Sequence, residues 1–281
     1  MTFSIVARSA DGDALGVAVA SKFLAAGAAV PAAEADVGAV ATQSYANLAY
    51  KAQALALLRS GVTATDAVAG LIAADSGPRG QRQVGVVGVS GDGATFTGDD
   101  CHGWAGGTAG DGYAVQGNML AGPDVVAAMA DAWESTMDEP RLAYRLLAAL
   151  AAGDDAGGDR RGRQSAALLV VARGQGYGGT SDVLVDLRVD DHVAPVAELA
   201  RLLDQHTFLF GRPDPATLID LSGEVAAEVG RLLAAAGHPP AGPAGADLDA
   251  ALASWAGVEN LEERIVVGRI DPLVLAHLRG H

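Results

Sequence analysis

Several segments of this chain are nearly continuous runs of small apolar residues, each about as long as a β-strand. They read "GVAVA" at 16–20, "GAVA" at 38–41, "VGVVGV" at 84–89 and "AALLVV" at 166–171. A strand that is apolar on both sides is buried on both faces, whereas a strand with one exposed face alternates apolar and polar residues. The sheets of this protein therefore need a covering layer on each side.

Asp-Gly pairs indicate how the strands are connected. "ADGD" lies between "TFSIVARS" and "ALGVAVAS", and "SGDG" lies between "RQVGVVGV" and "ATFTG". An Asp-Gly pair between two apolar runs predicts a tight β-hairpin, so we expect largely antiparallel sheets. Further strands are predicted at "VGAVATQS", "HGWAGG", "GYAVQGN", "SAALLVV" and "DVLVDLRV".

Helical patterning separates the groups of strands. It predicts one helix pair over 49–59 and 64–74, with Thr63 or Thr65 as a cap, and a second pair over 123–137 and 140–152. A further helix is predicted over 193–206. Two stacked antiparallel sheets, each covered outside by a helix pair, satisfy both this order and the burial of the strands. The predicted fold class is α+β, a four-layer αββα sandwich.

Beyond "FGRPDP" the chain changes in character. From Asp214 onward it is Ala-rich and helical, and "GHPPAGPAG" is a Pro- and Gly-rich connector. The segments "DLDAALASWAG" and "IDPLVLAHLRG" carry apolar residues at helical spacing. We therefore predict a main αββα domain over residues 1–212 and a small helical domain over residues 213–281.

Composition excludes several classes of partner. The formal net charge is -15, and binding of nucleic acid or an anionic membrane needs clustered Lys and Arg, so neither is expected. The single cysteine, Cys101, excludes a disulfide framework and is interpreted as a small buried hydrophobe. No secretory signal and no apolar run of about 18 residues is visible, which predicts a cytoplasmic protein without a membrane partner.

The first predicted strand follows a threonine that has only Met1 in front of it. Because cells remove the initiator methionine before a small residue, Thr2 is the candidate mature N-terminus. A free N-terminal threonine carries both a hydroxyl nucleophile and an α-amine whose ordinary pKa of about 7.7–8.0 suits a general base. A terminal threonine at the head of a buried strand in an αββα sandwich is typical of N-terminal nucleophile hydrolases. The alternative is a trimmed but chemically idle terminus.

Longer motifs connect the chain to a known family. They are "MTFSIVAR", "GVAVASKFLAAGAAVP", "GAVATQSYAN", "RQVGVV", "YAVQGNML", "GGDRRGRQSAALLVV" and "VDLRVDDH". Over roughly the first 210 residues the chain resembles the bacterial domain of unknown function family 1028, a branch of the N-terminal nucleophile hydrolases. The tail, with "WAGVENLEERI" and "GRIDPLVLAHLR", resembles the peptidoglycan-binding-like domain often fused to those proteins. The resemblance implies the fold and leaves the substrate open.

The wider superfamily implies candidate site residues. In its proteasome-like branch a lysine lies near the nucleophile, and here that lysine would be Lys22, because the third strand has none. The loop "GGDRRGRQS" would supply Asp159 and Ser165 to orient Thr2. One of the three arginines of this loop would bind a substrate carboxylate: Arg160, Arg161 or Arg163. The alternative is a solvated basic loop that pairs with surface acids.

Amide side chains at the ends of predicted strands are candidates for binding the reaction's oxyanion. Asn118, in "VQGNML", is the preferred donor, and Gln43, in "VATQSYAN", is the second. Asn47, in the same segment as Gln43, is a candidate contact for the substrate. The alternative for all three is turn formation and strand-end capping.

No metal and no cofactor is predicted. "VDDH" groups Asp190, Asp191 and His192, but an Asp directly before a helix is typical of an N-cap, and no further His lies at ligand spacing. "GGTAGDG" lacks the Lys-Ser/Thr of a phosphate-binding loop and opens no helix.

These features predict a hydrolase of amide C–N bonds, with Thr2 as nucleophile after Met1 removal. Its partner would be a small amide, an acylated amino acid or a peptide-like substrate. The alternative is a non-catalytic binding or assembly protein of the same fold, whose C-terminal domain engages peptidoglycan precursors or a partner subunit. We also expect a homo-oligomer, because such sandwiches often pair.

Overall fold

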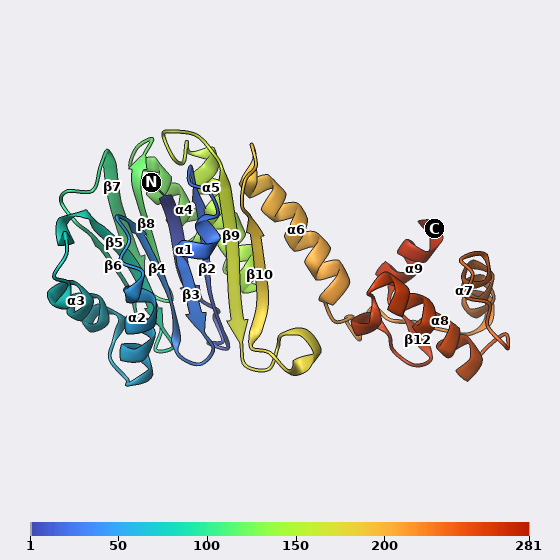
Figure 1. Ribbon diagram of the computed structural model, residues 1–281. Coiled ribbons are helices and arrows are strands. Elements are labelled where there is room, and N and C mark those ends of the chain that lie inside the picture. Colours follow the sequence, from blue (N-terminus) through green and yellow to red (C-terminus); the bar gives the residue numbers. More distant parts are fainter. Residues whose placement is uncertain (1, 281) are drawn as a thin grey trace. The chain divides into compact units, whose positions relative to one another are not determined.

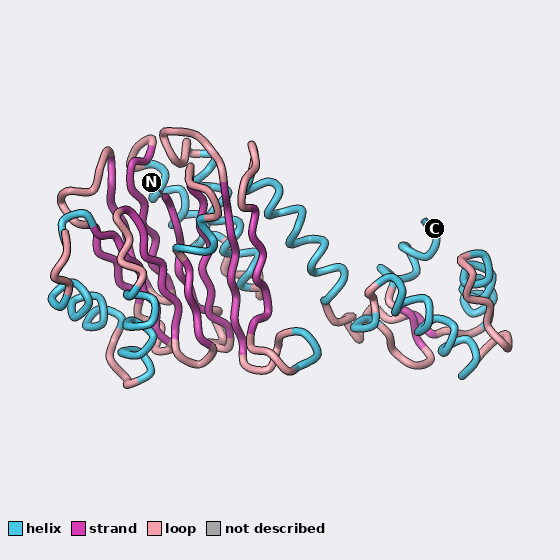
Figure 2. Tube along the Cα trace, in the orientation of Figure 1, coloured by secondary structure: helices cyan, strands magenta, loops and turns pink. Residues whose placement is uncertain are grey.

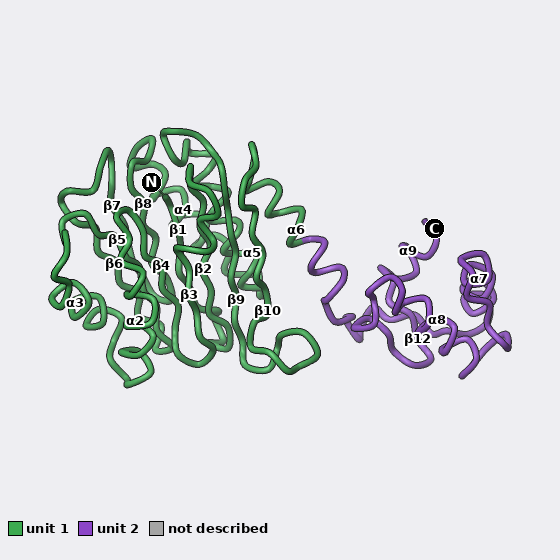
Figure 3. The backbone as a smooth tube through the Cα atoms, viewed as in Figure 1, with its two compact units in different colours: residues 1–203 green, residues 204–281 purple. Residues whose placement is uncertain are grey.

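The chain folds into two compact units (Figure 3). The computed structural model describes residues 2–280, and the division between the units falls between residues 203 and 204. This point lies inside helix α6 (Pro195–Phe210), upstream of the boundary predicted at residue 212. Separate hydrophobic clusters fill the two units, so each has a core of its own.

Unit 1 contains a six-stranded antiparallel sheet with the strand order β10-β9-β2-β1-β8-β7. Strand β1 lies inside this sheet and pairs with β2 on one side and β8 on the other. Asp11 and Gly12 turn the β1–β2 hairpin as the "ADGD" segment predicts, and Gly12 has a φ of 86°. The strands span Thr2–Arg8 (β1), Ala14–Ser21 (β2), Trp104–Gly110 (β7), Tyr113–Leu120 (β8), Ser165–Ala172 (β9) and Val183–Val189 (β10).

A four-stranded antiparallel sheet with the order β3-β4-β5-β6 faces the first sheet. Strands β1, β2 and β8 of the larger sheet contact β4 or β5 of the smaller one. The four strands span Pro31–Glu34 (β3), Gly38–Ser44 (β4), Arg82–Gly88 (β5) and Gly93–Thr97 (β6).

A helix pair covers the outer face of each sheet (Figures 1 and 2). Helix α5 packs on β1, β2 and β9 and α4 packs on β7 and β8, whereas α2 packs on β3 and β4 and α3 packs on β5 and β6. Thr63 caps α3 by accepting the N–H of Asp66 at 3.1 Å. The helices span Ala49–Arg59 (α2), Ala64–Ala74 (α3), Asp124–Ser135 (α4) and Leu142–Asp155 (α5), with short 3-10 turns at Arg79–Gln81 and Tyr177–Gly179.

The predicted mixture of helices and antiparallel sheets is confirmed, whereas the assignment to the N-terminal nucleophile hydrolase type stays a prediction. Helix α1 (Ala26–Ala29) and strand β3 lie in a segment where the pattern predicts no element. Four residues are too few to show a helical or strand period. No helix within residues 2–280 is both long enough and apolar enough to cross a membrane.

Unit 2 is small and mainly helical, as predicted. Its helices α7 (Gly223–Ala235), α8 (Ala246–Glu259) and α9 (Pro272–Gly280) enclose a core that includes Trp255, and β11 (Ile219–Asp220) pairs with β12 (Arg269–Ile270). A 3-10 turn spans Glu262–Arg264. The buried guanidinium of Arg264 forms an ion pair with Asp271, whose Oδ1 also accepts the N–H of Leu273 at 2.8 Å at the start of α9.

Candidate functional site

The side chains between the two sheets are polar at one end of the layer and apolar at the other. Because successive residues of a strand point to opposite faces, every second residue of β1, β2, β4, β5 and β8 faces this layer. At one end the residues are apolar and include Val6, Val17, Ala39 and Val87. At the other end they are polar and buried: Thr2, Ser4, Ser21, Gln43, Gln83, Gln116 and Asn118. This polar end is the candidate site.

Thr2 is the first residue of β1 and only 5% of its surface is exposed. It lies opposite Asn118 of β8, and its Oγ1 lies 3.1 Å from Oγ of Ser21, the last residue of β2. Both strands beside β1 in the six-stranded sheet therefore hold Thr2: β8 pairs with its backbone, and Ser21 of β2 contacts its hydroxyl.

Amide side chains from β4, β5 and β8 meet next to the Thr2 carbonyl. Gln83 Oε1 accepts hydrogen bonds from Gln43 Nε2 and from Asn118 Nδ2, each at 2.8 Å. The same two nitrogens approach the carbonyl oxygen of Thr2, at 3.4 Å for Gln43 and 3.5 Å for Asn118. The two preferred oxyanion candidates thus lie next to Thr2, on a common acceptor.

Ser4 extends this network deeper into the layer. Its Oγ donates to Gln43 Oε1 at 2.7 Å and accepts from Gln116 Nε2 at 2.7 Å. The other amide atom, Gln116 Oε1, is buried without a hydrogen-bond partner among the described residues. It points at Gly85, where a Cβ would lie only 1.9 Å away, so the absence of a side chain on Gly85 makes room for the network.

Backbone strain gathers at the same edge. Ala25, which follows β2, Ser44, at the end of β4, and Met119, next to Asn118 in β8, have φ values of 52°, 66° and 52°. Non-glycine residues in this left-handed region are uncommon and cost free energy, and they often mark functional sites. Among residues 2–280 the other two such residues, Asp36 in the β3–β4 turn and Asn260 after α8, are of types that tolerate the conformation.

Three further predicted residues lie near Ser21, the hydroxyl partner of Thr2: Lys22 and Asp159 in loops and Ser165 at the start of β9. Asp159 is buried, and its Oδ2 accepts the N–H of Lys22 at 2.8 Å. Lys22 Nζ donates to the carbonyl of Arg163 at 3.3 Å. Ser165 lies opposite Ser21 in the sheet, but its Oγ donates to the Phe23 carbonyl at 2.6 Å and accepts the N–H of Ala26. Asp159 and Ser165 therefore hold the loop after β2, next to the Ser21 that contacts Thr2.

The arginines of the 159–165 loop differ in their partners. Arg161 forms an ion pair with Asp159 at 3.1 Å, and Arg163 forms one with Asp154 at 2.7 Å. Arg160 is exposed, and its guanidinium has no ion-pair partner among the described residues. Arg161 and Arg163 thus pair with acids, as the alternative interpretation of this loop expects.

Asn47 has a local role at the start of α2. Its Oδ1 accepts the N–H of Ala49 at 3.2 Å, which forms an Asx turn and matches the turn formation considered as the alternative. Nearby, Arg82 Nε forms an ion pair with Asp75 at 2.8 Å and Arg82 Nη1 donates to the Tyr45 carbonyl at 2.6 Å. Arg82 thus ties the loop after β4 to the start of β5.

Three buried residues of the site are not predicted from the sequence: Ser4, Ser21 and Gln83. A usable signal exists, because each is a polar residue that interrupts an otherwise apolar strand or ends it. A single glutamine in a strand, however, reads equally well as one exposed position.

Residues 2–280 contain no group of three His, Cys, Asp or Glu side chains placed to hold a metal ion. In the "VDDH" segment, His192 Nδ1 accepts the N–H of Ala194 at 3.1 Å. The Sγ atom of Cys101 donates to the carbonyl of Arg82 at 3.5 Å.

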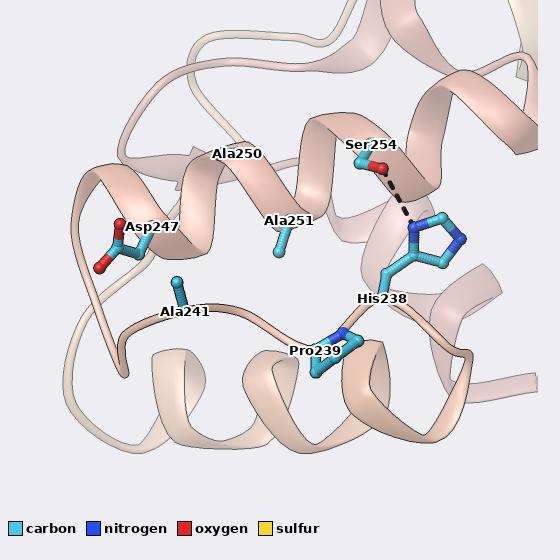
Figure 4. Close-up of a pocket in the computed structure, with 7 residues that line it drawn as sticks. All are labelled: His238, Pro239, Ala241, Asp247, Ala250, Ala251 and Ser254. Carbon is cyan, nitrogen blue, oxygen red and sulfur yellow. Dashed lines mark hydrogen bonds between the residues drawn. The ribbon is translucent and has the colours of Figure 1, made fainter.

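The described part of unit 2, residues 204–280, includes the following two cavities. One, of about 290 Å³, lies between α8 and the loop that precedes it. Figure 4 shows Asp247 at one end and, at the other, His238 Nδ1 within 3.2 Å of Ser254 Oγ, with alanines between them. The second, of about 390 Å³, is lined by Arg212, Asp214, Thr217, Arg264, Asp271, Pro272 and Leu273.

Comparison with known proteins relates both units to families. Residues 209–278 match the family described as "Putative peptidoglycan binding domain". No curated protein matches the chain. The crystal structure of protein SPO2555 from Silicibacter pomeroyi, a DUF1028 protein, is similar with 31% sequence identity and a TM-score of 0.66, over 73% of this chain and 89% of that one. Residues 2–199 match the family of unknown function DUF1028, and the chain therefore belongs to that family.

Proposed function

We propose that the chain is an N-terminal nucleophile amidohydrolase in which Thr2, freed by removal of Met1, attacks an amide carbonyl. Removal of Met1 concerns a position outside the described residues. The placement of Thr2 carries the proposal: it is buried at the head of a central strand, its hydroxyl contacts Ser21, and its carbonyl lies beside Gln43 and Asn118. Hydrogen-bonded neighbours of this kind hold a nucleophile in one orientation.

In the first half of the reaction, Thr2 Oγ forms a bond to the amide carbonyl carbon while its proton passes to the α-amine. The tetrahedral adduct then breaks its C–N bond, and the leaving amine takes that proton. Water adds to the resulting ester and releases a carboxylic acid, which restores the hydroxyl and the amine. The sum is an amide plus water giving an acid plus an amine.

Asn118 is the better oxyanion donor of the two predicted amides. One of its N–H groups is used at 2.8 Å by Gln83, and the other reaches the Thr2 carbonyl only at 3.5 Å, the limit of a hydrogen bond. Gln43 Nε2 has three acceptors within 3.4 Å, including Gln116 O. The second N–H of Asn118 is therefore the one available to turn toward a charged oxygen.

The test combines intact mass with a panel of amides, ureido acids and short peptides. We expect a mass without Met1, turnover of some panel members, and its loss in Thr2→Ala but not in Thr180→Ala, an exposed threonine in a distant loop. Thr2→Ser should keep part of the activity, because it keeps a hydroxyl. Retained Met1, or undiminished turnover by Thr2→Ala, would refute the proposal.

A second function, binding of a peptidoglycan-related ligand by unit 2, is supported by the family match of residues 209–278. We place the ligand in the cavity beside α8, because its two ends offer different polar groups, a carboxylate at Asp247 and the His238–Ser254 pair, across an alanine floor. A short peptide with a free amine and small side chains fits this arrangement.

Titration of the full chain with a soluble muramyl pentapeptide tests this second function. Asp247→Asn and Ser254→Ala should each weaken binding about tenfold, and Asp220→Asn, which lies outside the cavity, should leave it unchanged. Equal affinity in all four proteins would place the ligand elsewhere, and absence of binding to the wild type would remove the second function.

A further inference from the structure

The guanidinium of Arg160, at the edge of the site, is not neutralised by a neighbouring acid. Lys22 has no ion-pair partner among residues 2–280 either, but its Nζ donates to the carbonyl of Arg163. Three of the 19 Lys and Arg residues of this strongly acidic chain lie within 160–163. Arg161 and Arg163 are held by Asp159 and Asp154, whereas the guanidinium of Arg160 has no carboxylate within ion-pair distance among residues 2–280.

Backbone contacts place Arg160 at the same end of the six-stranded sheet as Thr2. The Arg160 N–H donates to the carbonyl of Met119 at 3.2 Å, and Met119 directly follows Asn118, the residue paired with Thr2. A Cβ on Gly103 would lie 3.5 Å from Arg160 Nη1, so the guanidinium lies over this glycine.

Two exposed rings continue the edge beyond Gly103. The carbonyl of His102 accepts the N–H of Met119 at 2.9 Å, which ties this loop to the strained residue beside Asn118. The His102 ring meets the ring of Tyr45 edge to face, with centroids 6.2 Å apart, and the Tyr45 residue is 57% exposed. A cation and an aromatic pair thus lie next to each other in loops at the edge that carries Thr2.

We infer that Arg160 is the specificity-determining residue of the proposed reaction and that the substrate is an N-acylated amino acid or short peptide with a free carboxylate. Arg160 binds the carboxylate of the amine-leaving half with two parallel hydrogen bonds, and Tyr45 and His102 contact an apolar substituent. This assignment rests on the proposed function for the bond that is cleaved. It excludes neutral amides as good substrates.

The experiment uses matched pairs of N-acetyl amino acids and their primary amides, which differ only in the negative charge. The wild type should favour the acids, and Arg160→Gln should lower kcat/KM for the acids about tenfold to a hundredfold while leaving the amides unchanged. For the acids, kcat/KM of Arg160→Lys should lie between the values of the wild type and Arg160→Gln, because an ammonium keeps the positive charge but cannot donate two parallel hydrogen bonds. Arg163→Gln, which removes an arginine already paired with Asp154, is the control.

Binding measured by calorimetry separates this inference from the proposed nucleophile. We expect the wild type and Thr2→Ala to bind N-acetyl amino acids and Arg160→Gln to bind none. This result would support Arg160 as the carboxylate-binding residue even where no turnover occurs. Three results would overturn the inference: equal binding of the acids by the wild type and Arg160→Gln, no binding of any acid, or an equal loss of amide and acid turnover in Arg160→Gln. None of these results affects the test of Thr2.

Discussion

The hydroxyl pair formed by Thr2 and Ser21 is the smallest unit on which the proposed chemistry depends. Thr2 can rotate about its Cα–Cβ bond, and a hydrogen bond to Ser21 Oγ at 3.1 Å favours one rotamer. Ser21 contacts Thr2, the proposed nucleophile, so we assign it as a positioning residue.

We expect Ser21→Ala to lower kcat about tenfold with little change in KM, because one neutral hydrogen bond is lost and the substrate contacts remain. Ser21→Thr restores the hydroxyl and should recover most of the rate. Steady-state kinetics of both variants on one panel substrate provides the check, and a rise in KM alone would show that Ser21 contacts the substrate.

Glycine at position 85 is required by the amide network beneath Thr2. A Cβ there would overlap Gln116 Oε1, and the packed sheets leave little freedom for movement, so Gly85→Ala should destabilise the protein by about 1–3 kcal/mol. Gly70 in helix α3 is the matched control, since its Cβ would meet no atom closer than 4.0 Å. Gly70→Ala should stabilise by about 0.5–1 kcal/mol. Denaturant unfolding measures both changes. Equal changes in the free energy of unfolding for Gly85→Ala and Gly70→Ala would contradict this account of Gly85.

Among the elements, the helices beside the smaller sheet are predicted with their observed bounds, Ala49–Arg59 and Ala64–Ala74. Local spacing and the Thr63 cap suffice for them. Strand partners are not local: β1 pairs with β8, more than a hundred residues later, and residue spacing says which face is buried but not which strand lies beside it. The site network was missed for this reason, because Gln43, Gln83 and Gln116 find partners only when four strands assemble.

A buried ion pair joins α3 to β5, and its contribution to stability should depend on pH. The hydrogen bond from Arg82, followed by those from Tyr50 and Gly77, holds the pKa of Asp75 well below its ordinary value. Because the folded-state pKa lies below the unfolded-state value of about 3.9, the pair stabilises the protein above that pH and loses its effect as the pH falls.

Asp75→Asn should therefore cost about 2 kcal/mol at pH 7, since it leaves the partly buried Arg82 without its charge partner, and the difference from the wild type should shrink below about pH 4. Asp186→Asn, which removes a partly exposed pair with Arg188, should cost less than about 1 kcal/mol. Unfolding free energies from pH 7 to pH 3 test both statements, and a gap that widens on acidification would reverse the assigned sign.

At the scale of the whole molecule, each unit is stabilised by its own core, and unit 2 contains a fully buried ion pair between Arg264 and Asp271. Asp271→Asn keeps an N-cap for α9 but removes the charge, so it should destabilise unit 2 by about 3 kcal/mol. Asp220→Asn, at an exposed pair, should change little. Hydrogen exchange of the full chain should quicken in α7 to α9 of the Asp271 variant, with β1 to β10 as internal reference, and unchanged exchange in α8 would contradict this role.

The central place of β1 in the six-stranded sheet has a consequence for biosynthesis. Strands β1 and β2 are translated before the two strands that flank their hairpin, β8 and β9. The β1 edge of this apolar hairpin stays open until β8 has been translated to Leu120. The β2 edge stays open until β9 has been translated to Ala172. The β1–β2 hairpin is thus made well before it is enclosed, and during that interval its open edges expose the nascent chain to aggregation.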